Sequence, residues 1–234
     1  MNSDPSGQLP LAIQLPDDET FASFYPAGNE ALIAALKQSL NAEHGGFLYV
    51  WGLQGAGKSH LLHAALNWCA GCHQPSSYVP LQHHQNMDPA MLDGLESLHL
   101  VALDNLDAIA GLNAWEQAIF DLYNRIQEQG KLLIVSANAA ARHLDVKLPD
   151  LGSRLDWGTS YQLAAPSDES KLAILQLRAN MRGLVLSDDA GRFLLHRASR
   201  DMADLWQILD QLDTASMQAQ RKLTVPFIKQ ALGY

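Results

Sequence analysis

The sequence predicts an α/β protein in which helices flank a parallel five-stranded sheet, followed by a small all-helical domain. Two observations lead to this fold class. Short apolar runs alternate with segments of helical periodicity as far as residue 163, which indicates right-handed βαβ crossovers and therefore parallel strands. Beyond Pro166 the periodicity is helical throughout.

The α/β part begins with an amphipathic helix, because Leu32, Ile33, Leu36 and Leu40 recur at helical spacing. A buried strand follows it, and a glycine-rich loop then leads into a second helix. In chain order we expect helix 30–40, strand 47–51, helix 61–69, strand 77–81, strand 98–103, helix 114–129, strand 131–135 and a short strand 161–163.

The helical part consists of segments that each open with Ser, Asp or Thr, the residue types that favour a helix N-cap. Pro166 marks the domain boundary, so we expect an α/β domain at 17–165 and a helical domain at 166–234. Residues 1–16 are interrupted by prolines and lack helical periodicity, which predicts an extended tail. The helices of the second domain are expected at 167–181, 187–198, 201–218 and 224–232.

The composition is that of a globular protein with 47% hydrophobic residues, and the formal net charge is −9. This charge argues against direct binding to a nucleic-acid backbone, which needs a dense basic surface. No stretch approaches the roughly 20 apolar residues of a membrane span. Asp4, Asp17 and Asp18 stand where a signal peptide would carry basic residues. We therefore expect a cytoplasmic protein that makes no membrane contact.

Cys69 and Cys72 form a C-x-x-C motif, which is compatible with a redox pair or with half of a zinc site. The sequence has no second cysteine pair, and the motif lies where helix 61–69 is expected to end. We therefore expect two reduced thiols at a helix end.

The glycine-rich loop has the pattern G-x-x-x-x-G-K-[ST] and lies between an expected strand and an expected helix. In such a loop, backbone N–H groups turn toward one point, the lysine reaches the β- and γ-phosphates, and the hydroxyl can ligate Mg²⁺. The alternative is a structural turn rich in glycine. We predict a nucleoside phosphate site formed by Gly52, Gln54, Gly55, Ala56, Gly57, Lys58, Ser59 and His60.

Polar residues follow two of the later strands. Asp104 ends the third strand and is expected to complete a magnesium site with Ser59. Asn105 stands where self-sufficient ATPases place a carboxylate that orients the attacking water, so intrinsic ATP hydrolysis should be weak or absent. Asn138 follows the fourth strand and is expected to reach the γ-phosphate or its water, although a strand-end turn also favours Asn.

The order of phosphate loop, aspartate strand, asparagine strand and helical domain resembles the AAA+ family, and other segments narrow the resemblance to its DnaA-like branch. The resemblance covers nearly the whole chain and implies a P-loop AAA+ core with a helical lid, an adenine nucleotide and Mg²⁺. Phe-Ala-Ser-Phe-Tyr-Pro at 21–26 is similar to the segment that walls the adenine pocket in this branch, which implies that Phe24, Tyr25 and Pro26 contact the base.

Leu-Pro-Asp-Leu-Gly-Ser-Arg-Leu-Asp-Trp-Gly at 148–158 resembles the arginine-finger segment of this branch. The resemblance implies that Arg154 reaches into the nucleotide of a neighbouring subunit, where a guanidinium stabilises charge in the transition state. The alternative is a local ion pair with Asp150 or Asp156.

One position departs from the family pattern. The arginine that the family lid offers at the start of its third helix is matched by Ala203, and Arg200 lies one turn earlier. We consider Arg200 a candidate replacement. If it does not replace the missing arginine, recognition of the γ-phosphate is weakened, so ADP is favoured over ATP as the resident ligand.

The tail contains Gln-Leu-Pro-Leu-Ala-Ile at 8–13, which resembles the peptide by which bacterial proteins dock on the DNA polymerase sliding clamp. Leu9, Leu11 and Ile13 would fill an apolar groove while Gln8 sets the register. The alternative is that the segment adds to a sheet edge in a homodimer and is hidden.

Within the DnaA-like branch the pattern is closest to a negative regulator of replication initiation, which docks on the DNA-loaded clamp and promotes hydrolysis of ATP bound to DnaA. Full-length DnaA continues into a helix-turn-helix domain, whereas this sequence ends at Tyr234, so we expect no sequence-specific DNA binding. The rival interpretations are an autonomous P-loop ATPase and a helper similar to the AAA+ helicase loaders.

Overall fold

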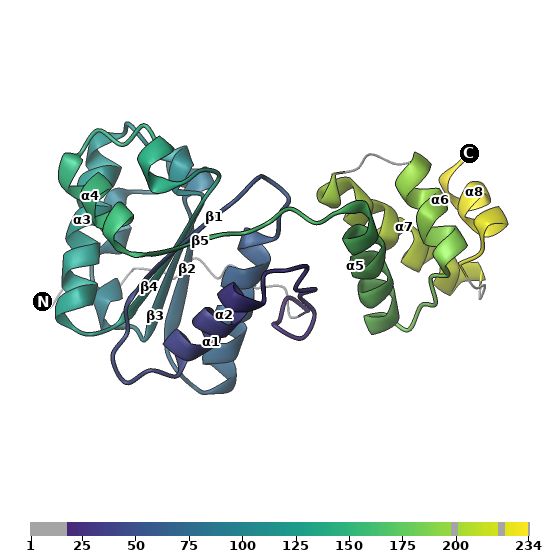
Figure 1. Cartoon of the computed structure of the whole chain (residues 1–234), viewed down its shortest axis with the longest axis horizontal. Coiled ribbons are helices and arrows are strands. Elements are labelled where there is room, and N and C mark those ends of the chain that lie inside the picture. Colours follow the sequence, from purple (N-terminus) through teal and green to yellow (C-terminus); the bar gives the residue numbers. More distant parts are fainter. Residues whose placement is uncertain (1–17, 198–200, 220–222, 234) are drawn as a thin grey trace, which may run out of the picture.

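The computed structural model describes residues 18–197, 201–219 and 223–233. It shows an α/β body built on a five-stranded sheet and a separate body of helices α5 to α8, joined by one extended segment after the last strand (Figure 1). The predicted fold class is therefore confirmed. The expected clamp-binding residues Gln8, Leu9, Leu11 and Ile13, as well as Arg200, lie outside the described residues.

All pairings in the sheet are parallel, and the strand order is β2-β3-β4-β1-β5. The phosphate loop follows β1, which lies between β4 and β5. Because parallel strands all end at the same edge, the residues after β1, β3 and β4 come together there. The strands are β1 Phe47–Trp51, β2 Ser76–Pro80, β3 Leu100–Asp104, β4 Leu132–Ala137 and β5 Thr159–Gln162.

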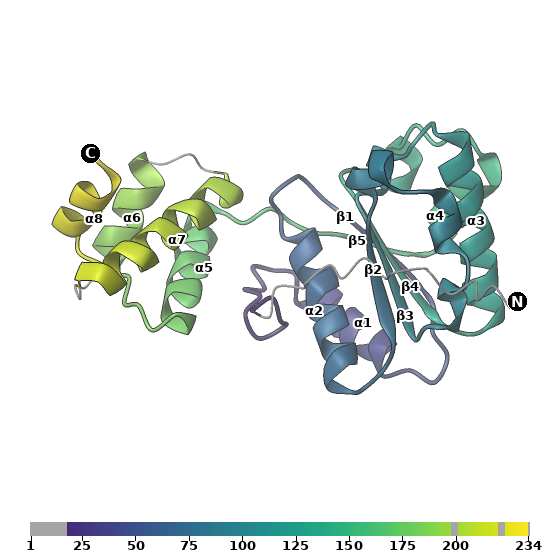
Figure 2. The same cartoon turned by 180° about the vertical axis from the view of Figure 1, so that it is seen from behind.

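Helices cover both faces of the sheet, and the two views agree on this layering (Figures 1 and 2). On one face, α1 (Glu30–Leu40) and α2 (Lys58–Gly71) pack against side chains such as Leu48 and Ile134. On the other, α3 (Asn113–Glu128) and α4 (Pro149–Trp157) bury apolar side chains against the alternate residues of the same strands. The central strands β3, β4 and β1 are thus buried on both faces, which explains their continuous apolar sequences.

The element boundaries differ from the expected ones where pairing decides them. β4 continues through Ser136 and Ala137 because these residues pair with Val50 and Trp51 of β1. β5 begins at Thr159, two residues before the expected strand, because it pairs with β1 alone and its polar residues at the sheet edge give no apolar run. The second helix begins at Lys58 because the phosphate loop leads directly into it.

The helical body contains α5 (Asp168–Met181), α6 (Asp188–Arg197), α7 (Met202–Ala219) and α8 (Val225–Leu232). Ser167 and Thr224 cap α5 and α8 by accepting hydrogen bonds from the backbone N–H groups of Ser170 and Phe227. The apolar faces of the helices form a core of their own, in which Leu175, Leu209 and Ile228 are fully buried. In the described part of the chain, no helix is both long enough and apolar enough to cross a membrane.

Candidate nucleotide-binding site

The loop between β1 and α2 has a backbone that only glycine adopts readily. Gly55 and Gly57 have positive φ angles of 77° and 102°. A Cβ atom on Gly57 would also lie 3.0 Å from the ring of Phe24, and one on Gly52 would lie 2.5 Å from the carbonyl oxygen of Leu163. The loop ends at the N-terminus of the 14-residue helix α2, where free N–H groups and the helix dipole favour an anion.

Lys58 is buried and points its ammonium group back into this loop. Its Nζ donates to the carbonyl oxygens of Gly52 and Leu53 at 2.8 and 3.0 Å, and to Oδ1 of Asn138 at 2.9 Å. Burial lowers the pKa of Lys58, while the negative charges of Asp104 and Asp107 oppose that shift. The positive charge is therefore held where a phosphate would bind, by acceptors that a phosphate can replace.

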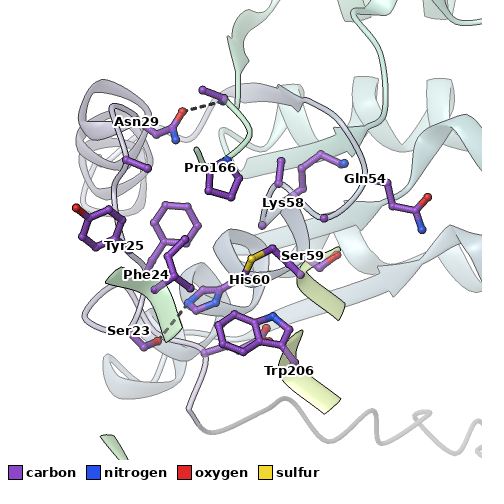
Figure 3. A pocket seen from close by; sticks show the side chains of 18 of the residues that line it. Ser23, Phe24, Tyr25, Asn29, Gln54, Lys58, Ser59, His60, Pro166 and Trp206 are labelled. Carbon is purple, nitrogen blue, oxygen red and sulfur yellow. Dashed lines mark hydrogen bonds between the residues drawn. The ribbon is translucent and has the colours of Figure 1, made fainter. Parts of the chain in front are cut away.

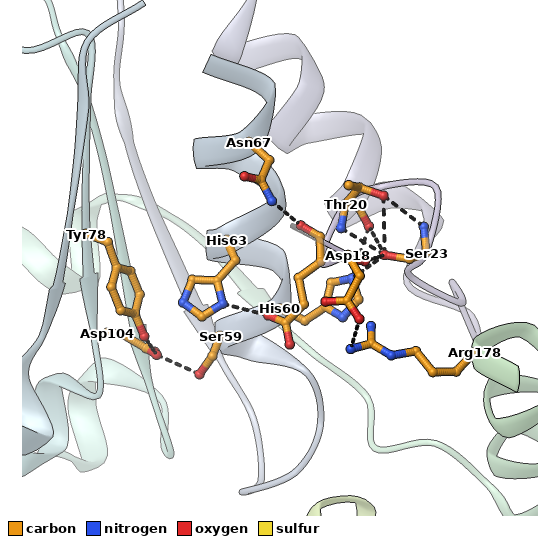
Figure 4. A network of polar contacts seen from close by, with 11 residues as sticks. Asp18, Thr20, Ser23, Ser59, His60, His63, Asn67, Tyr78, Asp104 and Arg178 are labelled. Atoms are coloured by element: carbon orange, nitrogen blue, oxygen red, sulfur yellow. Dashed lines mark hydrogen bonds and ion pairs between the residues drawn. The ribbon is translucent and has the colours of Figure 1, made fainter. Parts of the chain in front are cut away.

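Asp104 is buried at the end of β3 and accepts hydrogen bonds from three hydroxyl groups. Ser59 and Tyr78 donate to its Oδ2, each at 2.6 Å (Figure 4). Ser136 donates to its Oδ1. Burial and the nearby charge of Asp104 raise the pKa of Tyr78, so its hydroxyl remains a donor. A carboxylate beside the first helical serine after the loop is an oxygen donor set that suits Mg²⁺.

A cavity of about 380 Å³ lies over the loop and extends to the helical domain (Figure 3). Its volume falls in the range of small-molecule sites. Phe24, Tyr25 and His60 line it from the α/β domain, whereas Arg178 and Trp206 line it from the helical domain. Aromatic side chains next to a phosphate-binding loop provide the stacking surface that a nucleotide base needs.

His60 connects the loop to the segment that precedes α1. Its Nε2 lies 3.2 Å from the hydroxyl of Ser23 and 3.0 Å from the carbonyl oxygen of Thr20, and its ring meets that of Phe24 edge to face. Burial lowers the pKa of His60, so the ring is neutral at pH 7. The aromatic wall of the cavity is thus anchored to the first residues of α2.

A second polar cluster lies between α2, the segment before α1 and α5 (Figure 4). His63 Nδ1 lies 2.6 Å from the carboxylate of Glu19, and Asn67 donates to the carbonyl oxygen of Glu19. Arg178 of α5 forms an ion pair with Asp18. A salt bridge thus links the two domains beside the pocket, which Arg178 also lines.

The sequence-based predictions for the nucleotide site can be compared with this geometry. Pro26 is not a lining residue: its carbonyl accepts a hydrogen bond from Asn29 Nδ2 and shapes the turn before α1. Gly52 and Asp104 also lie behind the cavity wall, the first packed on Leu163 and the second reached through Ser59. The predicted residues that do line the cavity are Phe24, Tyr25, Gln54, Gly55, Ala56, Gly57, Lys58, Ser59, His60 and Asn138, and Asn105, which stands in place of a carboxylate, lines it as well.

Sequence reasoning missed the part of the wall that comes from elsewhere in the chain. Met202 and Trp206 are four residues apart on α7 and so share a face, but periodicity does not tell which partner that face meets. Arg178 lies within the regular pattern of α5, where nothing local distinguishes it from a surface arginine. The other missed lining residues are Glu19, Ser23, Ala27, Asn29, Gln82, Ala164, Pro166 and Ile174.

Arg154 is exposed on α4 and is not among the residues that line the cavity. Leu151 and Leu155 bury the inner face of α4, while the guanidinium of Arg154 lies 5.8 Å from the ring centroid of Tyr123 on α3. In the described part of the chain it forms no ion pair with Asp150 or Asp156, the alternative that the sequence left open. Trp157, one turn on, is 83% exposed.

Solved structures of AAA+ proteins share this architecture. Domain III of the replication initiation protein DnaA from Thermotoga maritima superposes with a TM-score of 0.79 at 17% identity, over 94% of this chain and 97% of that chain. AMPPCP-bound DnaA from Aquifex aeolicus superposes with a TM-score of 0.72 at 19% identity, over 88% of this chain and 68% of that chain. The RuvB Holliday junction branch migration motor from Thermotoga maritima gives a TM-score of 0.65 at 14% identity, over 88% and 69%.

The chain thus shares the AAA+ fold of these DnaA structures. The family model described as the lid domain of Hda matches residues 168–232. The chain therefore has the fold of these DnaA structures, and its helical part matches the Hda lid domain.

Proposed function

We propose that this protein binds an adenine nucleotide in the cavity and acts as a negative regulator of DNA replication initiation. In this proposal it docks on the DNA-loaded sliding clamp through residues 8–13 and presents Arg154 to ATP held by DnaA. Hydrolysis of that ATP then inactivates the initiator. Support comes from the DnaA-like fold, from the match of residues 168–232 to the Hda lid domain, and from the position of Arg154.

The residues of the cavity suit an adenine nucleotide with Mg²⁺. Lys58 and the N–H groups of the loop would hold the phosphates, and Ser59 with Asp104 would hold the metal. The bound metal would neutralise phosphate charge. Phe24, Tyr25 and Trp206 offer the apolar surface for the base. That a DnaA of the same fold was solved with AMPPCP supports the choice of adenine.

The orientation of Arg154 is the observation that most directly supports the proposed regulatory role. A guanidinium that serves the protein's own nucleotide would line the cavity, yet Arg154 is exposed on α4 and stacks on Tyr123. A rigid helix that holds an exposed arginine toward solvent is suited to complete the active site of another subunit. Asn105 at the end of β3 favours the same role, because an amide cannot act as the base for hydrolysis at the protein's own site.

Reconstitution tests this function directly. ATP-loaded DnaA is incubated with the protein and clamp loaded on DNA, and the fraction of DnaA that carries ADP is followed over time. Arg154→Ala should lower the rate at least about tenfold, because an arginine finger supplies transition-state stabilisation. Arg142→Ala, a change at another exposed arginine of the same domain, should leave the rate unchanged. Equal rates for wild type and Arg154→Ala would show that the finger lies elsewhere.

The clamp contact has its own test. Capture on immobilised clamp should be lost in a protein that carries Gln8→Ala together with Leu11→Ala, because the first removes the amide hydrogen bonds and the second an apolar anchor. Equal capture would remove the clamp from the proposal and favour a helper of the helicase-loader kind. ATP turnover by the isolated chain, at a rate that clamp and DnaA leave unchanged, would instead support an autonomous ATPase.

A further inference from the structure

The amide of Asn138 has an orientation that chemistry alone assigns. Its Oδ1 lies 2.9 Å from Nζ of Lys58, and its Nδ2 lies 2.7 Å from Oδ2 of Asp107. An ammonium group only donates hydrogen bonds, and an ionised carboxylate only accepts them. The amide oxygen must therefore face Lys58, and the amide nitrogen must face Asp107.

Asp107 holds Asn138 at two points. Besides the side-chain bond, its Oδ1 accepts the backbone N–H of Asn138 at 2.9 Å, so one carboxylate takes both kinds of donor of that residue. Asp107 lies in the short 3-10 helix Leu106–Ala108 that follows β3. Asn105 starts this turn with a positive φ of 60°, and its N–H donates to Asp104 and Ser136. The carboxylate of Asp107 is thus fixed to the end of the sheet.

This arrangement directs the acceptor oxygen of the Asn138 amide, and not its donor nitrogen, toward the place of a third phosphate. The lysine of a phosphate loop contacts the β- and γ-phosphates, so a group bonded to Lys58 Nζ borders the terminal phosphate. An asparagine that recognises a γ-phosphate must donate to it from Nδ2. Here one N–H of Nδ2 donates to Asp107 and holds the nitrogen on the Asp107 side, whereas the acceptor Oδ1 faces the phosphate region and competes for Lys58.

We propose that Asp107 is a specificity-determining residue that makes the site prefer a nucleoside diphosphate over a triphosphate, by locking Asn138 with its amide oxygen toward the phosphates. This inference rests on the proposed function, in which an adenine nucleotide occupies the cavity. It assigns the preference to a residue outside the cavity lining. Asp107 acts through Asn138 and is therefore a positioning residue.

Calorimetric titration of the full chain with ADP and with AMPPCP, at a fixed Mg²⁺ concentration, tests the assignment. In Asp107→Asn the new amide can donate to Oδ1 of Asn138, which allows the Asn138 amide to turn and present Nδ2 to the third phosphate. The ratio of the dissociation constants for AMPPCP and ADP should then fall by about fivefold or more, the size expected when a hydrogen bond replaces an opposed acceptor. Asp121→Asn, an equal change of charge on α3 away from the cavity, should leave the ratio as in wild type.

A second variant separates positioning from a direct effect of charge. Asn138→Ala removes the opposing oxygen and should lower the ratio in the same direction. If Asp107 acts through Asn138, adding Asp107→Asn to Asn138→Ala should change the ratio less than about twofold. Additive effects of the two changes would overturn the positioning role. Melting curves and binding stoichiometry show whether each variant is folded. Both dissociation constants of a variant describe its folded molecules, so unfolded protein does not change their ratio.

The outcomes also distinguish this inference from the function on which it rests. An unchanged ratio in Asp107→Asn, with both nucleotides bound, would overturn the inference and leave the adenine nucleotide site intact. If the wild-type protein bound neither ADP nor AMPPCP, the nucleotide site and the inference would both be overturned.

Discussion

The guanidinium of Arg178 on α5 lies 2.5 Å from the carboxylate of Asp18, in the segment before α1. The same guanidinium stacks 5.3 Å from the ring centroid of Trp206 on α7. Arg178 and Trp206 both line the cavity above the phosphate loop. The salt bridge therefore holds the helical domain in the position that completes the cavity, and binding of a ligand there should be coupled to the arrangement of the domains.

Loss of this salt bridge should weaken nucleotide binding. In Arg178→Ala we expect the dissociation constant for ADP to rise about fivefold to tenfold, because the ligand must then order the helical domain itself. Titration calorimetry measures the change. Arg182→Ala is the matched control, since Arg182 pairs with Asp210 inside the helical domain and is not a lining residue. Equal losses in the two variants would contradict a specific role for the Asp18 contact.

Lys58→Ala should reduce nucleotide affinity at least about tenfold, because a charge-assisted hydrogen bond to phosphate is removed from a buried site. Calorimetry with ADP gives the measurement. Lys147→Ala removes one positive charge at an exposed position of the same domain and should bind ADP as wild type does. Unchanged affinity in Lys58→Ala would refute the assignment of the phosphate loop.

Glu116 positions the helix that carries Arg154. Its carboxylate is fully buried and accepts N–H groups from Gly111, Lys147 and Leu148, the last of which is the N-cap of α4. Glu116→Ala leaves these donors unpaired and should cost about 2–4 kcal/mol of unfolding free energy. Urea denaturation measures the loss.

For comparison, Glu128→Ala changes an exposed glutamate at the end of α3, the helix that also carries Glu116. Its unfolding free energy should stay within about 0.5 kcal/mol of that of wild type. A similar cost for both variants would show that the backbone contacts of Glu116 do not stabilise the fold.

The cluster around Glu19 should make stability depend on pH in the acid range. Burial alone would raise the pKa of Glu19, but the hydrogen bond from His63 and electrostatic interactions with His60 and Arg178 outweigh it, so the pKa lies below the usual 4.5. A lowered carboxyl pKa contributes stability that is present above the pKa of the unfolded chain and is lost as the pH falls through the folded value.

Glu19→Gln should therefore destabilise the protein at pH 7, and its difference from wild type should shrink as the pH falls below the usual carboxyl pKa of 4.5 and through the lowered folded value. Urea midpoints at several pH values test this. A difference that stays constant over this range would show that the ionised carboxylate of Glu19 does not stabilise the fold.

The two cysteines should differ sharply in reactivity. Cys69 is buried, and burial, with a smaller effect of Cys72, raises its thiol pKa to about 11, whereas Cys72 is exposed. Iodoacetamide at about pH 8 should therefore modify Cys72 alone, because the thiolate is the reactive form. Mass spectrometry before and after denaturation should show one and then two modified thiols. Protection of both thiols in the native protein would favour the redox or zinc alternative.

Sequence patterns predicted the elements whose signal is local. Helix Glu30–Leu40 and strand Phe47–Trp51 were predicted with the observed bounds, because their apolar spacing is read directly from neighbouring residues. The end of β4 and the start of β5 were misplaced, because each depends on pairing with β1. The roles of Arg154 and of the tail stay predictions, since they concern contacts with other molecules.

The phosphate loop is a feature that the local sequence identifies without knowledge of the tertiary structure. Its glycines, Lys58 and Ser59 are consecutive, and the backbone geometry they require is encoded within a few residues, so the chain order alone identifies the site. The partner of the amide of Asn138 could not be identified in this way. Asp107 lies 31 residues from Asn138 in the sequence and meets it only because β3 and β4 end side by side. Likewise, Arg178 meets Asp18 only through the docking of α5, because packing between distant segments leaves no periodic signal in either of them.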